Sequence, residues 1–177
     1  MGLAVLQGGI ASLTWGAMYF YKELPWLFVV IYDTMSASSL LLWAGKLFLA
    51  MMVMVPPAML MGLAFPLLVR AAAGEQLALG KPVGRLYGWN TVGAILGAGL
   101  GGLFFLPWIF VQGTVLLAIT VNVFLAAILY IRAADDDPYR IVKAAIGGMG
   151  LAAILHLSAA PWNPLQMAAG TYKYVYN

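Results

Sequence analysis

The sequence predicts an all-α integral membrane protein with about five transmembrane helices, one of them a Gly-rich packing helix, and no soluble domain. Hydrophobic residues make up 64% of the 177 residues, charged residues only 8%, and the mean hydropathy is +0.94. About a quarter of the residues in a soluble domain are charged, so this composition cannot give a globule a water-facing shell. The apolar residues also gather in runs near the length that crosses a hydrocarbon core about 30 Å thick.

Charge and residue usage exclude several classes of function. The net charge is +3, and nine Lys and Arg residues are too few and too scattered to form a phosphate-binding face, so we expect no nucleic-acid partner. Cysteine is absent and there is one histidine. These counts exclude Cys-ligated metal sites and multi-histidine sites within the chain. We therefore expect no metal, no cofactor and a lipid bilayer as the surroundings.

The first half of the chain contains two apolar runs separated by a mixed segment. Residues 3–21 form the first predicted span, which Lys22 and Glu23 close. Residues 24–46 are interrupted by Asp33 and several serines, so we expect an extramembrane or re-entrant stretch at the membrane interface. Residues 47–69 form the second predicted span.

Three prolines interrupt the second span, and we expect them to kink it. Pro56, Pro57 and Pro66 remove backbone donors. Such breaks persist in a membrane only where neighbouring helices or water satisfy the freed carbonyl groups. A packing kink is the simpler interpretation, and a substrate site is the alternative.

The second half predicts three further spans. Residues 87–108 form the third and residues 114–131 the fourth, with a break at Gln112 and Gly113. Residues 141–160 form the fifth, which we expect to start with Asp137 as the cap and Pro138 at the first helical position. Residues 1–160 are thus one membrane domain, followed by a polar and aromatic tail over residues 161–177.

The distribution of Lys and Arg predicts the topology. The loops 70–85 and 132–143 carry three basic residues each, whereas the 107–113 connection carries none. Short basic loops stay in the cytoplasm, so we place both loops on that side of a bacterial inner membrane. The same arrangement places the C-terminal tail outside.

Small residues repeat every four positions along the third span and share one helix face. Such a face lets helix backbones approach closely in lipid, where helix association lacks a hydrophobic driving force. A packing seam against another helix or subunit is the main interpretation, and a cofactor or lipid groove is the alternative. The residues of this face are Gly93, Ala94, Gly97, Ala98, Gly101 and Gly102.

A few polar side chains lie within the apolar runs. Asn90 and Thr91 begin the third span and Asn122 lies inside the fourth. A polar group in hydrocarbon is costly unless it is bonded, so we expect hydrogen bonds between helices. His156 lacks a nearby carboxylate in the sequence, which favours a packing residue over a proton relay. The sequence contains no catalytic motif that we recognise, so we assign no catalytic residue.

Two segments resemble the membrane region of spermidine-synthase-like proteins. They are residues 57–68, PAMLMGLAFPLL, and residues 84–107, GRLYGWNTVGAILGAGLGGLFFLP. The resemblance covers about residues 47–131 and extends weakly into residues 162–172. It implies a multi-span, transporter-like helical region that is fused to an aminopropyltransferase domain in that family. That domain, with its glycine loop and acidic catalytic residues, has no counterpart in this sequence, so no catalytic residue can be carried over.

The sequence therefore leaves three functions open. The first is a non-catalytic membrane domain or accessory subunit that packs against other membrane helices in a larger assembly. The second is the membrane anchor of a longer aminopropyltransferase. The third is a fragment of a transporter, which paired broken helices near the membrane midplane would favour.

Overall fold

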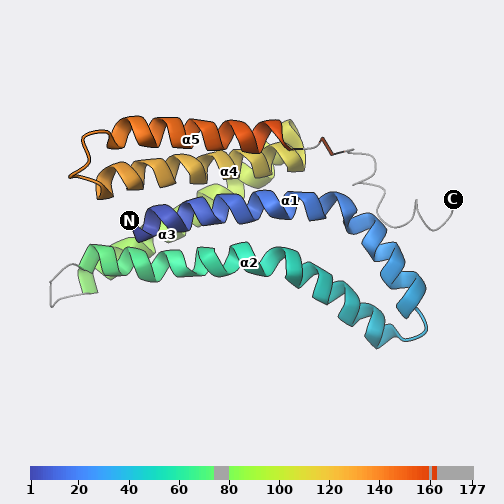
Figure 1. The fold of residues 1–177 in the computed structure, drawn as a ribbon. Coiled ribbons are helices and arrows are strands. Elements are labelled where there is room, and N and C mark those ends of the chain that lie inside the picture. The colour runs from blue at the N-terminus through green and yellow to red at the C-terminus, as the bar shows by residue number, and fades with distance from the viewer. Residues whose placement is uncertain (74–79, 160, 163–177) are drawn as a thin grey trace.

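The computed structural model describes residues 1–73, 80–159 and 161–162, which form a bundle of long helices (Figure 1). Within that described part, 91% of the residues are helical and no strand occurs, as the all-α prediction requires. The elements in chain order are α1 (Gly2–Met35), α2 (Ser39–Ala73), α3 (Gly80–Leu100), the π-helical turn η1 (Gly101–Phe105), α4 (Leu106–Ala133) and α5 (Arg140–Leu157).

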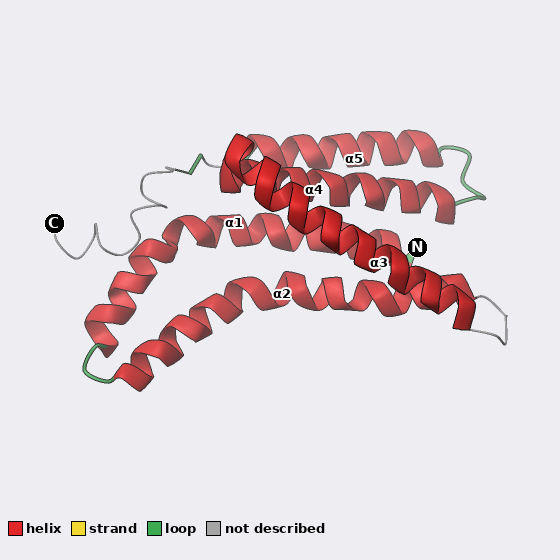
Figure 2. Cartoon of the chain, turned by 180° about the vertical axis from the view of Figure 1, so that it is seen from behind, coloured by secondary structure: helices red, strands yellow, loops and turns green. Residues whose placement is uncertain are grey.

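Four helical stretches are long and apolar enough to cross a membrane: 2–35, 39–72, 80–133 and 140–157. The third stretch has 54 residues and contains a reversal at Phe110, whose φ of 57° and ψ of −179° are not helical. The sequence placed this break two residues later, at Gln112 and Gly113. Figure 2 shows the two arms on either side of the reversal running in opposite directions. These arms correspond to the third and fourth predicted spans.

The first two helices are longer than the sequence predicts. The prediction separates residues 24–46 from both neighbouring spans, but α1 continues to Met35 through Pro25, and α2 begins at Ser39. At 1.5 Å per residue each helix is about 50 Å long, well beyond the thickness of a hydrocarbon core. Both helices change direction along their length, and their connected ends extend beyond α4 and α5 (Figure 1). The interruption at Asp33 is therefore accommodated inside a helix, near its end.

A small core joins α1, α4 and α5. α4 packs on α1 along one side and on α5 along another. Apolar side chains from all three helices meet there, and Ala11 and Ile119 have exposed fractions of 0% and 1%. The buried cluster consists of Ala11, Met18, Ile119, Val123 and Leu155.

The outer surface of the bundle is apolar. Large side chains such as Leu40, Trp43 and Trp108 are mostly exposed, and the described residues include no buried polar or charged residue. A soluble domain shows the opposite distribution. Such an exterior suits contact with lipid or with other protein surfaces.

The fifth helix starts later than predicted. It begins at Arg140 with Tyr139 as its cap residue, and Tyr139 makes no side-chain cap hydrogen bond. Asp137 and Pro138 belong to the turn before the helix. The Asp137 carboxylate accepts the backbone N–H of Tyr139 at 2.9 Å, which is the hydrogen bond expected of a cap at Asp137, but Pro138 and Tyr139 form a turn before the regular helix begins.

The basic segments of the chain lie together at one end of the bundle. The end of α2, the start of α3 and the α4–α5 connection all lie at one end of the bundle (Figures 1 and 2). The α1–α2 connection and the reversal at Phe110 lie toward the other end. The predicted tail, residues 161–177, lies outside the described residues except for Pro161 and Trp162.

Candidate functional site

The glycine face of α3 and η1 is the most distinctive surface of the molecule. We define it as Gly93, Ala94, Gly97, Ala98, Gly101 and Gly102. α3 and η1 contain no buried residue. A methyl group added at any of the four glycines would meet no atom within 4 Å. The described chain therefore leaves this face without a packing partner.

α3 contacts α2 near its start and continues into η1 at its other end. Near its start, the Tyr87 ring meets the Phe65 ring of α2 edge-on, with centroids 4.8 Å apart. At the other end the chain enters the π-helical turn, where the Leu106 N–H donates to the Gly101 carbonyl. Single π-helical turns occur often at functional sites. Between these two ends the glycine face stays open.

The predicted polar candidates do not join helices to one another. Thr91 Oγ1 donates to the Tyr87 carbonyl at 2.9 Å, and Asn122 Nδ2 donates to the Ala118 carbonyl at 2.8 Å. Both bonds lie within the helix of the donor, and neither side chain bonds to another of the described helices. A hydrogen bond to the carbonyl four residues earlier is a local alternative to a bond between helices, because that carbonyl lies within reach of a short polar side chain. Asn90 is exposed on the surface of α3.

The three proline candidates lie inside a continuous helix. α2 stays helical through Pro56, Pro57 and Pro66. Pro56 and Pro66 are exposed, and Pro57 is partly buried. The ribbon of α2 bends along its length, which agrees with the expected kink (Figure 1).

Close helix contacts within the chain occur at glycines that the sequence did not single out. A Cβ at Gly9 of α1 would lie 3.1 Å from Leu60 Cδ1 of α2. A Cβ at Gly45 of α2 would lie 3.0 Å from both Ile31 Cγ2 and Met35 Sδ of α1. These isolated glycines lack the four-residue repeat that marks α3, so periodicity alone gives no signal for them.

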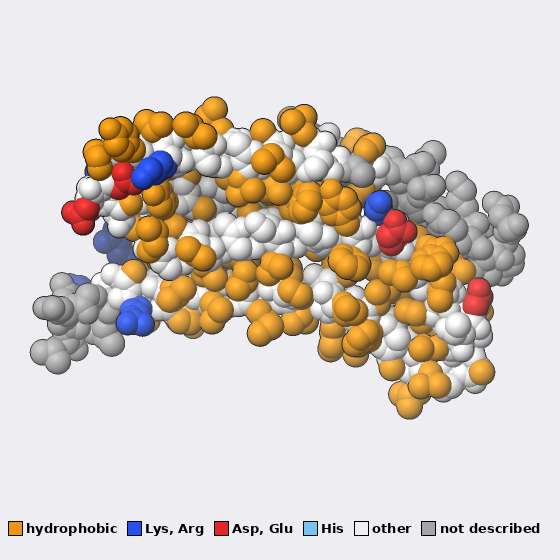
Figure 3. Space-filling model, viewed as in Figure 1, with side chains coloured by type: hydrophobic (Ala, Val, Ile, Leu, Met, Phe, Trp, Pro, Cys, Tyr) orange, Lys and Arg blue, Asp and Glu red, His pale blue; other side chains and the backbone are white. Residues whose placement is uncertain are grey.

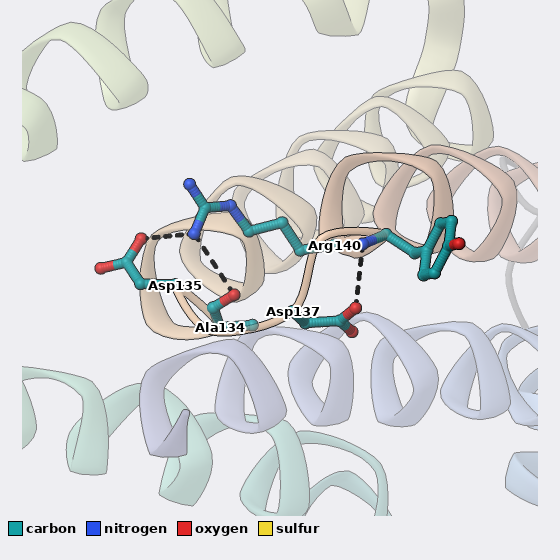
Figure 4. Close-up of polar contacts among 5 residues, drawn as sticks. Ala134, Asp135, Asp137 and Arg140 are labelled. Atoms are coloured by element: carbon teal, nitrogen blue, oxygen red, sulfur yellow. Dashed lines mark hydrogen bonds and ion pairs between the residues drawn. The ribbon is translucent and has the colours of Figure 1, made fainter.

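At the basic end of the bundle, two ion pairs stabilise the turn between α4 and α5. Arg140 forms an ion pair with Asp135 at 2.7 Å and also donates to the Ala134 carbonyl at 3.4 Å (Figure 4). Lys143 forms a second ion pair with Asp137 at 2.7 Å. The hydrogen bond from Lys143, followed by that from the Tyr139 N–H, lowers the pKa of Asp137. The acidic residues therefore stabilise a turn.

Polar contacts at the other end hold α5 to α1 and to the reversal. Trp15 Nε1 donates to the Leu155 carbonyl at 3.0 Å, and the Tyr19 hydroxyl donates to the Ser158 carbonyl at 2.9 Å. The Gln112 side chain accepts the backbone N–H of Trp162 at 2.9 Å. His156 lies 2.9 Å from the Ala152 carbonyl through Nδ1 and 3.4 Å from the Thr120 hydroxyl through Nε2. His156 is exposed, and one of its two ring nitrogens faces its own helix while the other faces α4.

Across the ranges that the structure describes, no group of three or more His, Cys, Asp or Glu side chains could hold a metal ion. Comparison of the chain with protein-family models, curated proteins and solved structures gives no match. The resemblance to spermidine-synthase-like proteins therefore stays a prediction based on residues 57–68 and 84–107.

Proposed function

We propose that this chain is a non-catalytic, multi-pass membrane domain or accessory subunit that docks onto other membrane helices through the glycine face of α3. The single observation that carries this proposal is the open glycine face. Its small residues line an apolar helix, and no part of the described chain covers them. Faces of this type support close backbone contact between helices in lipid.

The distribution of charge supports a membrane setting. On the face shown in Figure 3, Lys, Arg, Asp and Glu side chains lie toward the two ends of the bundle, and hydrophobic side chains dominate between them. A charge at the centre of a bilayer costs about 2.5–3.5 kcal/mol on insertion scales, so charges at the two ends suit a spanning bundle. The bacterial inner membrane, with the basic end in the cytoplasm, is the location that we propose.

The position of α3 supports a protein partner on the glycine face. A helix that faces only lipid can carry bulky apolar side chains on every face. Leu103, which is 73% exposed, is such a residue. A stripe of glycine gives lipid little to contact and lowers helix propensity by about 0.5–1 kcal/mol per residue relative to alanine. A second helix that fits the stripe recovers dispersion contacts along both backbones.

No structural observation favours either alternative function. The described part of the chain brings together no set of groups that could transfer an aminopropyl group, so the enzyme alternative depends on a further domain. The transport alternative calls for paired broken helices at the midplane. α2 remains helical through its prolines, and the break at Phe110 forms the reversal between two arms.

The absence of cysteine permits a direct test by single-cysteine cross-linking. We expect a photoreactive thiol probe on Ala94→Cys, in native membranes, to form an adduct with another membrane helix. The same probe on Ile146→Cys reports the background, because Ile146 is 69% exposed on α5 and lies outside the glycine face. The proposal would be contradicted if the probes at both positions labelled lipid alone and to the same extent.

A further inference from the structure

A cavity of about 470 Å³ opens at the basic end of the bundle, where the start of α1 meets the ends of α2 and α4. Its lining includes two arginines, Arg70 from α2 and Arg132 from α4. Apolar side chains complete much of the wall, among them Leu3, Leu67 and Leu129. The cavity thus combines two guanidinium groups with a hydrophobic surface.

Both arginines are available to an anion. The ion pairs among the described residues join Lys22 to Glu23, Arg140 to Asp135 and Lys143 to Asp137, and none includes Arg70 or Arg132. None of the described residues that line the cavity carries a carboxylate. A guanidinium group presents a planar fork of donors that matches the oxygens of a phosphate group. Two such groups on one cavity therefore favour a phosphate-bearing ligand.

The position of the cavity indicates whether the phosphate group belongs to a lipid or to a free ion. Arg70 and Arg132 lie in the last turns of their helices, at the same end as Lys81 and Arg85 of α3. In a spanning bundle this end lies at the level of the lipid headgroups. The leucines of the wall would contact the glycerol and the first carbons of an acyl chain, which a free phosphate lacks. Basic pockets between transmembrane helices on the cytoplasmic side bind anionic lipid headgroups.

We infer that this cavity is a binding site for the headgroup of an anionic phospholipid, with Arg70 and Arg132 as the phosphate ligands. The inference rests on the membrane setting of the proposed function and is independent of the glycine face. It assigns a ligand class to a site that the sequence presents only as two separate basic loops. Lipid at this position would also join the ends of α2 and α4, which lie far apart in the sequence.

Native mass spectrometry of the purified protein with equal amounts of phosphatidylglycerol and phosphatidylcholine tests the inference. We expect the wild-type protein to retain phosphatidylglycerol in about tenfold preference, and the R70Q/R132Q variant to lose that preference, because each basic group near the surface contributes substantially to binding of anionic lipid. The matched control is R85Q, which removes an exposed charge at the same end but outside the cavity. It should keep the wild-type preference.

A second variant guards against a folding defect. R70K/R132K keeps both charges but removes the planar fork, so it should fold as the wild type does and bind phosphatidylglycerol more weakly than the wild type. An equal loss in R85Q and R70Q/R132Q, or no preference in the wild type, would overturn the inference. Saturable binding of inorganic phosphate alone, lost in R70Q/R132Q, would also overturn it in favour of a soluble anion.

A separate measurement distinguishes this inference from the proposed function. Resistance of the chain to carbonate extraction from membranes reports the membrane setting directly. A chain that resists extraction but shows no lipid preference overturns only the lipid site. A chain that is extracted overturns both the lipid site and the proposed function.

Discussion

The indole of Trp15 on α1 donates its Nε1–H to the carbonyl oxygen of Leu155, at 3.0 Å, in the last turn of α5. The last four carbonyl groups of a helix lack partners within the helix. Neighbouring carbonyls are satisfied locally: the Ile154 carbonyl accepts the Ser158 N–H and hydroxyl, and the His156 carbonyl accepts the Ala159 N–H. The Leu155 carbonyl instead bonds to a helix more than a hundred residues earlier in the chain. This bond fixes the position of the end of α5 on α1.

Replacing Trp15 should loosen that end of the bundle. We expect Trp15→Phe to lower the free energy of unfolding by about 1 kcal/mol, since hydrogen bonds between membrane helices contribute about 0.6 to 1.7 kcal/mol. Unfolding in mixed micelles with increasing denaturing detergent measures the change. Trp26→Phe is the control, because Trp26 is 57% exposed. An equal effect of the two substitutions would contradict the role of the Trp15 bond.

The reversal at Phe110 should depend on Gly113. A Cβ at Gly113 would lie 2.9 Å from Ile109 Cβ, an atom fixed to the backbone that cannot rotate away. Gly113→Ala should therefore destabilise the protein, because overpacking costs about 1–3 kcal/mol and exceeds the gain in helix propensity.

Gly99→Ala provides the matched comparison for this prediction. Gly99 lies in α3, where an added Cβ meets nothing within 4 Å. The same substitution should there be neutral or stabilising by up to about 1 kcal/mol. Thermal unfolding of both variants measures the difference, and a Gly113→Ala variant as stable as Gly99→Ala would exclude the close contact in the reversal.

The Asp137 contact should respond to acid. Hydrogen bonds from Lys143 and the Tyr139 N–H lower the pKa of Asp137 below its ordinary value of 3.8. Because the pKa in the folded state is the lower one, the contact contributes fully above about pH 4 and is lost as the pH falls through the folded pKa. The carboxyl ¹³C chemical shift of Asp137 should therefore titrate with a midpoint below 3.8.

Removing the lysine tests the cause of this shift. Lys143→Gln should move the Asp137 midpoint upward, toward the ordinary value, while the Tyr139 N–H keeps part of the effect. Asp137→Asn should remove the titration step altogether. A midpoint that does not move in Lys143→Gln would contradict the ion pair.

Much of the helical framework could be predicted from the sequence because it depends on the length and composition of apolar runs. The runs at 47–69 and 141–160 correspond to α2 and α5. The ends of the helices were harder to predict from the sequence. Pro25 and Asp33 suggest an interruption, yet each fits inside a long helix: proline is tolerated at a bend, and the carboxylate lies exposed near the end of α1.

The candidate site likewise has features that the sequence predicts and features that appear only in the structure. The repeat of Gly93 and Gly97 is visible in the sequence, and the structure leaves these residues open to a partner. The contacts of Gly9 and Gly45 could not be predicted, because they depend on which helices become neighbours. The cavity between Arg70 and Arg132 likewise forms from residues about sixty positions apart, which come near one another only when α2 and α4 end on either side of the start of α1.

The mass of the native assembly, extracted from membrane in a mild detergent, tests the central claim most directly. We expect the wild-type chain to occur in a complex heavier than its own 19.0 kDa, and Gly97→Leu to release it, because the leucine side chain would fill the glycine face without disturbing the chain itself. Gly62→Leu, at an open glycine on α2, should leave the complex intact. A wild-type mass of 19.0 kDa, or a complex that survives Gly97→Leu unchanged, would contradict docking through the glycine face.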